Sequence, residues 1–244
     1  MDVDDLKRRA AREAATHTRS GMVIGLGHGS TAAHAVEKIG ELLATGTIAG
    51  VFAVPCSEAV ADHATRLGIP LTTLAHHPII DLTIDGADEV DPQLRLIKGG
   101  GGALLREKIV AQASRREIIV VDVGKMSSRL GSNHCLPIEI ARFGWTSQIH
   151  YIEELGAKVA LRRDGHGEPI MTDQHNFLVD ADFGPIDDPS ALAARLSARA
   201  GILAHGLFID LVTDLIVASP DGLRHVTAQR TARPASGAHG RELR

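Results

Sequence analysis

The sequence predicts an α/β fold: a parallel sheet covered by helices, together with a second, smaller α+β unit. Short apolar runs alternate with helical patterns through the first half of the chain, an order typical of parallel sheets whose strands are connected by helices. In the second half the order becomes strand, helix, strand, strand, helix, strand, which is typical of a small split α+β unit. A final apolar run from Leu211 to Ala218 is expected to return to the first sheet.

The first half is expected to begin with an amphipathic helix that starts near Asp2 or Asp4. Each later strand is expected at a short apolar run, and each later helix at a segment with apolar residues three or four positions apart. The strands are expected at residues 22–24, 51–54, 82–84 and 118–121, and the helices at 31–43, 57–67 and 103–113.

The second half is expected to hold strands at 136–140, 158–161, 176–180 and 201–204, and helices at 146–155 and 189–198. We place domain boundaries near Ser132 and His205. The chain then divides into a first domain at 1–131, a small domain at 132–205, a return to the first domain at 206–222 and an Arg-rich tail at 223–244. The tail has five Arg and no Phe, Trp or Tyr, so we interpret it as a frayed, solvated end rather than a nucleic-acid-binding arm.

The composition argues against several classes of protein. A chain of 244 residues with 44% hydrophobic residues can bury a substantial core, which argues against global disorder. Its two cysteines are too few for a disulfide scaffold or a Cys-rich zinc module. Five Phe, one Trp and one Tyr, with a net charge of −4, do not favour nucleic-acid binding. No apolar run approaches the roughly 20 residues of a membrane span, and the charged N-terminus lacks a signal-peptide pattern, so we expect a cytoplasmic protein.

The first motif with chemical potential is the segment Gly25–Thr31, between an expected strand and an expected helix. Glycines at such a turn let backbone amides approach a ligand, and a helix N-terminus with Ser30 and Thr31 favours a phosphate. The glycine spacing misses the dinucleotide fingerprint by one position, and no acidic residue follows the next strand, so NAD binding is disfavoured. A ligand loop and a plain tight turn remain equally supported by this motif alone.

The second motif, Asp85-Gly86-Ala87-Asp88-Glu89, directly follows an expected strand. Carboxylates at the carboxyl end of a parallel strand are well placed to act on a ligand. Asp85 and Asp88 could handle the hydroxyl protons of a sugar, or could form a solvated acidic turn. A metal site is less favoured, because no His lies in the cluster and the calcium-loop spacing is not met.

The third motif is Lys98 with the glycine run 99–102, followed by a helix that contains Glu107. A glycine run between an apolar segment and a helix favours a tight, anion-binding turn over a flexible linker. Glu107 lies about one and a half turns into the helix and could face the same cavity, although such a residue is more often a surface ion-pair partner. Lys125 follows another strand and, taken alone, reads as an exposed loop lysine.

Taken together, these segments resemble the type A family of ribose-5-phosphate isomerases over about residues 6–222, outside the Arg-rich tail. The resemblance is carried by GLGHGSTA at 25–32, DLTIDGADEVDP at 81–92, LIKGGGGALLREKIV at 96–110, VDVGKMSSRLG at 121–131, LPIEI at 136–140 and HGLFIDLVTDLIVASPDG at 205–222. It implies a Rossmann-like domain that carries the site, an inserted α+β (ferredoxin-like) domain, and a homodimer that uses neither metal nor other cofactor.

The resemblance also implies roles for individual residues. Glu107 matches the catalytic base, Asp85 matches an acid that opens the sugar ring and moves hydroxyl protons, and Lys98 completes the catalytic set. The substrate-binding positions are matched by Lys7, His28, Gly29, Ser30, Thr31, Asp85, Gly86, Ala87, Asp88, Lys98, Gly99, Gly100, Gly101 and Lys125. The chain departs from the family at His28, where Thr or Ser is common, at Cys56-Ser57 and at Asp210.

The function predicted from the sequence is the interconversion of D-ribose 5-phosphate and D-ribulose 5-phosphate through an enediolate, a step of the non-oxidative pentose phosphate pathway. A carboxylate carries the proton between the first two carbons, and Lys98 with the glycine amides holds the oxyanion. One alternative is an isomerase of another phosphorylated sugar, which the departure at His28 motivates. A second is a non-catalytic sugar-phosphate sensor, which the retained Glu107 and the lack of a basic helix-turn-helix disfavour.

Overall fold

The main layer of the molecule is a six-stranded sheet with the strand order β13-β12-β6-β3-β1-β2. The computed structural model describes residues 2–228. Neighbouring strands of this sheet are parallel, except that β13 runs antiparallel to β12. The strands are β1 (Val23–Leu26), β2 (Phe52–Pro55), β3 (Leu82–Asp85), β6 (Glu117–Asp122), β12 (Asp214–Ser219) and β13 (Gly222–Thr227).

Helices cover both faces of the six-stranded sheet. On one face, α1 (Val3–Ala15), α2 (Ser30–Ala44) and α3 (Glu58–Arg66) share a core with Ile118 of β6. On the other face, α4 (Leu104–Ala113) contributes Ala111 to a core with Ile119. Because successive residues of a strand point to opposite faces, β6 is buried on both sides, as expected for a central parallel strand.

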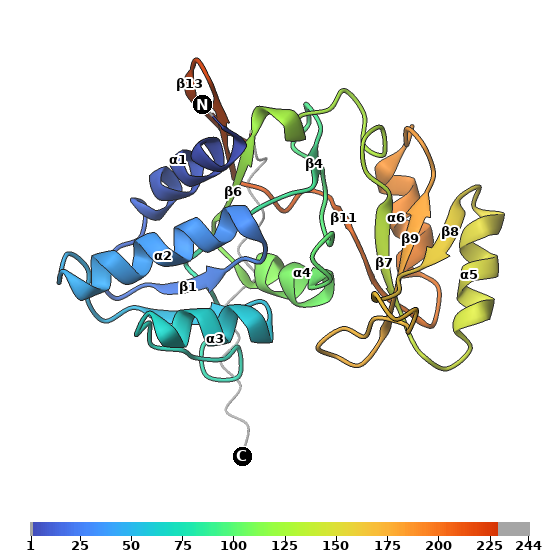
Figure 1. Ribbon diagram of the computed structural model, residues 1–244, viewed down its shortest axis with the longest axis horizontal. Helices are drawn as coiled ribbons and strands as arrows, with labels where there is room; N and C mark the ends of the chain where they lie inside the picture. The colour runs from blue at the N-terminus through green and yellow to red at the C-terminus, as the bar shows by residue number, and fades with distance from the viewer. Residues whose placement is uncertain (1, 229–244) are drawn as a thin grey trace, which may run out of the picture.

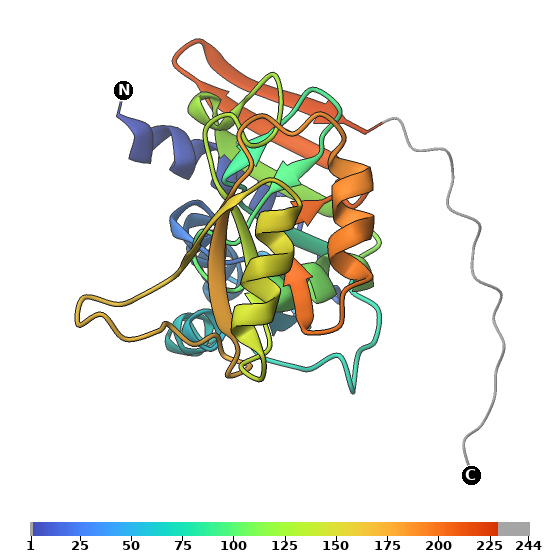
Figure 2. The same cartoon turned by 90° about the vertical axis from the view of Figure 1, so that its right-hand side faces the viewer.

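A second lobe contains a four-stranded antiparallel sheet with the order β10-β7-β9-β8. Two helices, α5 and α6, lie side by side on one face of this sheet (Figure 2) and close a separate core around Ile138 and Ile152. The elements are β7 (Leu136–Ile140), α5 (Trp145–Glu154), β8 (Lys158–Leu161), β9 (Phe177–Asp182), α6 (Pro189–Ser197) and β10 (Ile202–His205). The secondary structure of this lobe runs from Leu136 to His205.

The two lobes meet at α4 and at a small third sheet (Figure 1). This sheet has the order β11-β5-β4, with β4 at Glu89–Val90, β5 at Leu96–Ile97 and β11 at Leu207–Phe208. The chain passes through it on its return from the small lobe, since Leu207 of β11 pairs with Ile97 of β5. The residue that follows β5 is Lys98, so this junction places the third motif between the lobes.

The structure confirms the predicted fold class and differs in two details. The short strands β4, β5 and β11 were not expected, because two-residue strands leave no periodic pattern in the sequence. The expectation of a frayed end from residue 223 is wrong for its first part, since Gly222–Thr227 pairs with β12 along its whole length. The remainder of the Arg-rich tail, from residue 229, lies outside the described residues.

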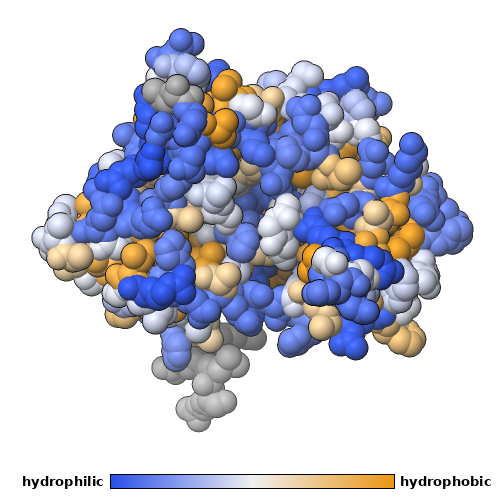
Figure 3. Space-filling view, viewed as in Figure 1, coloured by the Kyte–Doolittle hydropathy of each residue, from blue (hydrophilic) through white to orange (hydrophobic). Residues whose placement is uncertain are grey.

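The face of the molecule shown in Figure 3 is mostly hydrophilic, and its hydrophobic residues form small separate groups. Scattered exposed apolar side chains of this kind are normal for a folded domain. Within residues 2–228, no helix has the length and apolar character needed to cross a membrane.

Candidate active site

The candidate site forms where loops follow the carboxyl ends of β1, β3 and β6. Gly27–Gly29 joins β1 to α2, Asp85 is the last residue of β3, and Lys125 ends the 3₁₀ turn at Val123–Lys125 after β6. Ligands of open parallel sheets bind at this edge. The predicted first and second motifs and Lys125 therefore come together because their strands are parallel neighbours or near neighbours in one sheet.

At the centre of the site, the ammonium of Lys98 lies between two carboxylates. Its Nζ is 3.0 Å from Oδ2 of Asp85 and 3.0 Å from Oε1 of Glu107, and it donates to the Gly86 carbonyl at 2.6 Å. The exposed fractions of Lys98, Asp85 and Glu107 are 2%, 1% and 4%. Burial lowers the pKa of the Lys98 ammonium, but the two adjacent carboxylates outweigh this effect and raise it above its ordinary value. Lys98 therefore remains charged.

Glu107 is the one carboxylate of this triad with an unused oxygen. Its Oε2 is buried and has no hydrogen-bond partner among the described residues. Burial raises the pKa of Glu107 to about 7, with Lys98 opposing the rise and Asp85 adding to it. A carboxyl group with a pKa near neutrality and a free oxygen can take and return a proton efficiently. The surface ion-pair interpretation of Glu107 is therefore wrong, since its partner is the buried Lys98.

Asp85 is held on both oxygens. Its Oδ1 accepts from the backbone N–H groups of His28 at 3.0 Å and Gly86 at 2.7 Å, while its Oδ2 faces Lys98. A Cβ atom at Gly27 would lie 2.2 Å from the Asp85 Oδ1, so only glycine lets the β1 loop approach this closely. The Asp85 carboxylate therefore holds both the loop after β1 and the Lys98 ammonium in place.

A cavity of about 110 Å³ opens beside the triad. Both Lys98 and Glu107 line it, together with every other residue predicted to bind substrate except Asp85. The lining residues are Lys7, His28, Gly29, Ser30, Thr31, Gly86, Ala87, Asp88, Lys98, Gly99, Gly100, Gly101, Glu107 and Lys125. The structure thus joins three separate sequence motifs in one cavity, whose lining does not include Asp85, the ion-pair partner of Lys98.

One end of the cavity is suited to an anion. The α2 helix starts at Ser30 without a side-chain cap, so its first N–H groups and its dipole face the cavity end. Lys7 of α1 donates to Ser30 Oγ at 3.1 Å. The Lys125 ammonium lines the same cavity and has no hydrogen bond or ion pair to another described residue. Two cations and a helix N-terminus are the usual partners of a phosphate group.

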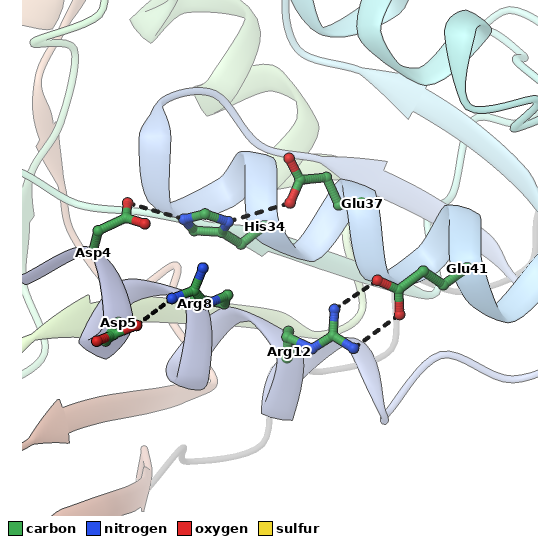
Figure 4. A network of polar contacts seen from close by, with 7 residues as sticks. All are labelled: Asp4, Asp5, Arg8, Arg12, His34, Glu37 and Glu41. Atoms are coloured by element: carbon green, nitrogen blue, oxygen red, sulfur yellow. Dashed lines mark hydrogen bonds and ion pairs between the residues drawn. The ribbon is translucent and has the colours of Figure 1, made fainter.

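Polar contacts join α1, the helix that carries Lys7, to α2 (Figure 4). Arg12 of α1 donates to both oxygens of Glu41 of α2, at 2.7 and 2.9 Å. His34 of α2 lies between Asp4 and Glu37, at 3.2 and 3.3 Å. Exposed pairs of this kind contribute little stability individually, but they join the two helices on either side of Lys7.

The glycine turn forms another part of the cavity wall. The Gly100 N–H donates to Oδ2 of Asp88 at 2.7 Å, and a Cβ atom at Gly100 would lie 2.7 Å from Oδ1 of the same carboxylate. The segment is therefore a tight turn, as the sequence favoured, and not a flexible linker; it orients Asp88 in the cavity wall.

His28 separates the candidate site from a neighbouring cavity of about 240 Å³. Its Nδ1 is 2.9 Å from Ser57 Oγ, and its ring lies over Gly101, where an added Cβ would be 2.4 Å from the His28 Cδ2. Sequence reasoning singled out His28 as a departure but did not find its contact with Ser57. It also missed Arg162, which binds the glycine turn from the small lobe. Neither contact has a local sequence signal, because its partners are far apart in the chain.

Among the described residues, no group of three or more His, Cys, Asp or Glu side chains is arranged to hold a metal ion. The chemistry that the site offers is proton transfer by a buried carboxyl group, beside a permanent positive charge and an anion-binding helix end. The fold and this site define an α/β enzyme that moves protons on a small anionic substrate.

Comparison with known proteins identifies the family. Residues 52–222 match the family model described as ribose 5-phosphate isomerase A (phosphoriboisomerase A). The chain is 58% identical to ribose-5-phosphate isomerase A of Chloroflexus aurantiacus, over 91% of this chain and 92% of that one. It superimposes on ribose 5-phosphate isomerase from Plasmodium falciparum with a TM-score of 0.90 and 38% identity, covering 93% of this chain and all (100%) of that one. A third match is a D-ribose-5-phosphate isomerase in complex with phospho-erythronic acid, with a TM-score of 0.91, 37% identity and coverage of 93% and 100%. The chain belongs to the ribose 5-phosphate isomerase A family, which confirms the predicted resemblance.

Proposed function

We propose that this protein interconverts D-ribose 5-phosphate and D-ribulose 5-phosphate. The observation that carries the proposal is the free Oε2 of Glu107, on a carboxyl group whose other oxygen is held by Lys98 at 3.0 Å. An aldose–ketose interconversion needs one group that removes a proton from the second carbon and returns it to the first. Family membership and the anion-binding end of the cavity support the choice of a phosphorylated sugar as substrate.

In the proposed reaction, Glu107 Oε2 removes the proton from C2 of the open-chain aldose. The electron pair of the C–H bond forms the C1–C2 double bond, and the carbonyl oxygen at C1 becomes an oxyanion. The Lys98 ammonium and the N–H groups of the glycine turn stabilise that charge. Protonated Glu107 then returns the proton to C1, while the hydroxyl proton at O2 passes to O1. The C2–O2 carbonyl forms in this step, and the product is the ketose.

The phosphate group of the substrate would bind at the other end of the cavity. Lys7, Lys125 and the α2 N-terminus with Ser30 and Thr31 supply its partners. Because these residues hold the non-reacting end, their binding energy orients C1 and C2 against Glu107. Substitutions at the phosphate end should therefore change mainly KM, and substitutions at the Glu107 end should change mainly kcat.

We assign Asp85 a positioning role. Both of its oxygens are engaged, and it lies outside the cavity lining. It holds the Lys98 ammonium in place and fixes the loop after β1. In this assignment Asp88, which lines the cavity, is the acid that contacts the sugar hydroxyls.

The same proposal includes a place in the non-oxidative pentose phosphate pathway, a homodimer and a cytoplasmic location. Family resemblance supports the dimer, and Cys56 and Cys135 are both free thiols, as is usual in reducing compartments. Sedimentation equilibrium of the purified chain tests the dimer directly. A monomer at micromolar concentration would contradict it.

The function is tested by incubating the purified protein with a panel of phosphorylated aldoses and following ketose formation. We expect D-ribose 5-phosphate to give the highest kcat/KM. A higher value for another aldose phosphate would favour the alternative of a different sugar substrate. Binding of these sugars without any conversion would favour the sensor.

A further inference from the structure

The small lobe reaches into the site through a single arginine. Arg162 directly follows β8 of the antiparallel sheet, and its Nη1 donates to the carbonyls of Gly99 at 3.2 Å and Gly100 at 3.1 Å. Its remaining donors face Asp180 of β9, with Nε at 3.0 Å from Oδ2. The guanidinium thus has a fixed orientation. Its Nε and Nη2 donate to the Asp180 carboxylate, and its Nη1 donates to the carbonyls of two consecutive peptide groups.

The direction of these bonds determines where the glycine amides point. In a trans peptide the C=O and the following N–H point in opposite directions, and no cis peptide bond occurs among the described residues. The Gly99 carbonyl points to Arg162, and the N–H of the same peptide group, that of Gly100, points to Asp88 in the cavity wall. The Gly100 carbonyl also points to Arg162, so the Gly101 N–H must face away from the small lobe.

The Gly101 amide is available to a ligand. It makes no hydrogen bond to any described residue, and Gly101 lines the cavity beside Lys98 and Glu107. Hydrogen bonds from a cation to the two carbonyls polarise the peptide groups and strengthen their N–H groups as donors. Glycines have wide conformational freedom. The Gly99 carbonyl also accepts from the Gly102 N–H at 3.0 Å, but the Gly100 carbonyl has no second partner among the described residues, so without Arg162 the Gly100–Gly101 peptide group could rotate.

We propose that Arg162 is a positioning residue for the isomerisation: it orients the Gly99–Gly100 and Gly100–Gly101 peptide groups so that one amide holds Asp88 and the next stabilises the developing oxyanion. This inference rests on the proposed function. It gives the small lobe a part in catalysis through the glycine turn, because the paired strands β8 and β9 carry Arg162 and Asp180 to that turn.

The test compares Arg162→Met and Arg162→Lys with Arg163→Met. Arg163 is the matched control, since it lies next in the chain and carries the same charge, and among residues 2–228 its side chain donates only to the Gly167 carbonyl. We expect Arg162→Met to lower kcat about 10²-fold, the cost of a small misplacement of catalytic groups, with little change in KM because the phosphate partners lie at the other end. Arg162→Lys keeps the charge but cannot bridge both partners, so we expect its kcat to lie between those of Arg162→Met and the wild type. We expect the kcat of Arg163→Met to match that of the wild type.

A second measurement is independent of turnover. In spectra of the ¹⁵N-glycine-labelled protein, Arg162→Met should shift the Gly100 and Gly101 amide signals and abolish the Gly101 response to phospho-erythronic acid, whereas Arg163→Met should do neither. If the wild type does not isomerise ribose 5-phosphate, the proposed function fails while these signals still decide the orientation. The Arg162 proposal is overturned if Arg162→Met leaves the glycine signals unchanged, or if it lowers stability and leaves kcat equal to that of Arg163→Met.

Discussion

Replacing Glu107 by Gln is expected to stabilise the folded protein at alkaline pH, although it removes the proposed catalytic base. Burial and Asp85 raise the pKa of Glu107 from the ordinary value of 4.5 to about 7, against the opposing effect of Lys98. Such a rise means that the folded state disfavours the ionised carboxylate by about 3 kcal/mol. Gln has nearly the same shape and carries no charge, so the variant does not incur this cost.

The pH window follows from the direction of the shift. Below pH 4.5 Glu107 is protonated in both the folded and the unfolded state, and it contributes no difference. Between pH 4.5 and about 7 the unfolded chain releases the proton first, so the wild type loses stability as pH rises. Above pH 7 the folded wild type carries the full free-energy cost of the ionised Glu107 carboxylate. The stability gain of Glu107→Gln should therefore be larger at pH 8 than at pH 5, by up to about 3 kcal/mol.

Urea unfolding at both pH values measures this gain as the difference in free energy of unfolding between variant and wild type. Glu153→Gln, a change at an exposed helical carboxylate, is the matched control and should show no pH-dependent gain. An equal gain at pH 5 and pH 8, or a loss of stability at pH 8, would refute the assignment of Glu107 as a buried carboxyl group with a raised pKa.

The remaining predictions concern catalysis and specificity. The kcat/KM for ribose 5-phosphate should rise with pH through about 7, because Glu107 must be ionised to remove a proton; a profile that is flat from pH 5.5 to 9 would contradict this role. Lys7→Ala should raise KM about 10–100-fold with a smaller effect on kcat, since Lys7 binds the non-reacting phosphate; a loss confined to kcat would place Lys7 elsewhere. His28→Thr should join the candidate site to the neighbouring cavity of about 240 Å³ and raise the activity on hexose phosphates relative to that on ribose 5-phosphate. If the ratio of these two activities is the same in the variant and the wild type, His28 does not limit substrate size.

The parts of the site that the sequence predicts are those that depend on local chain geometry. Asp85, Lys98 and Lys125 each follow a strand or a strand-like run, and the carboxyl ends of parallel strands meet at one edge. The glycine run could be interpreted as a turn because it separates an apolar run from a helix. Apart from β13, which was expected to be part of a frayed tail, the helices and the strands of four or more residues were predicted near their true positions, since each carries its own apolar periodicity.

The parts that the sequence does not predict depend on contacts between distant segments. Leu207 pairs with Ile97, although the residues of the small lobe lie between them in the sequence. Strands of two residues also have no periodic pattern of their own. Arg162 lies 62 positions from Gly100, so only the packing of the two lobes brings them together. The engagement of both Asp85 oxygens is equally invisible, because it depends on how closely Gly27 approaches β3.

The most direct test of the account is the conversion of D-ribose 5-phosphate by the purified protein in the presence of EDTA, with Glu107→Gln measured in parallel. We expect the wild type to form D-ribulose 5-phosphate at an undiminished rate in the chelator. We expect Glu107→Gln to bind the substrate and to turn over roughly 10²–10⁴-fold more slowly, the usual contribution of a general base. Near-normal turnover by Glu107→Gln, or loss of wild-type activity in EDTA that a divalent metal restores, would contradict a metal-independent proton transfer by Glu107.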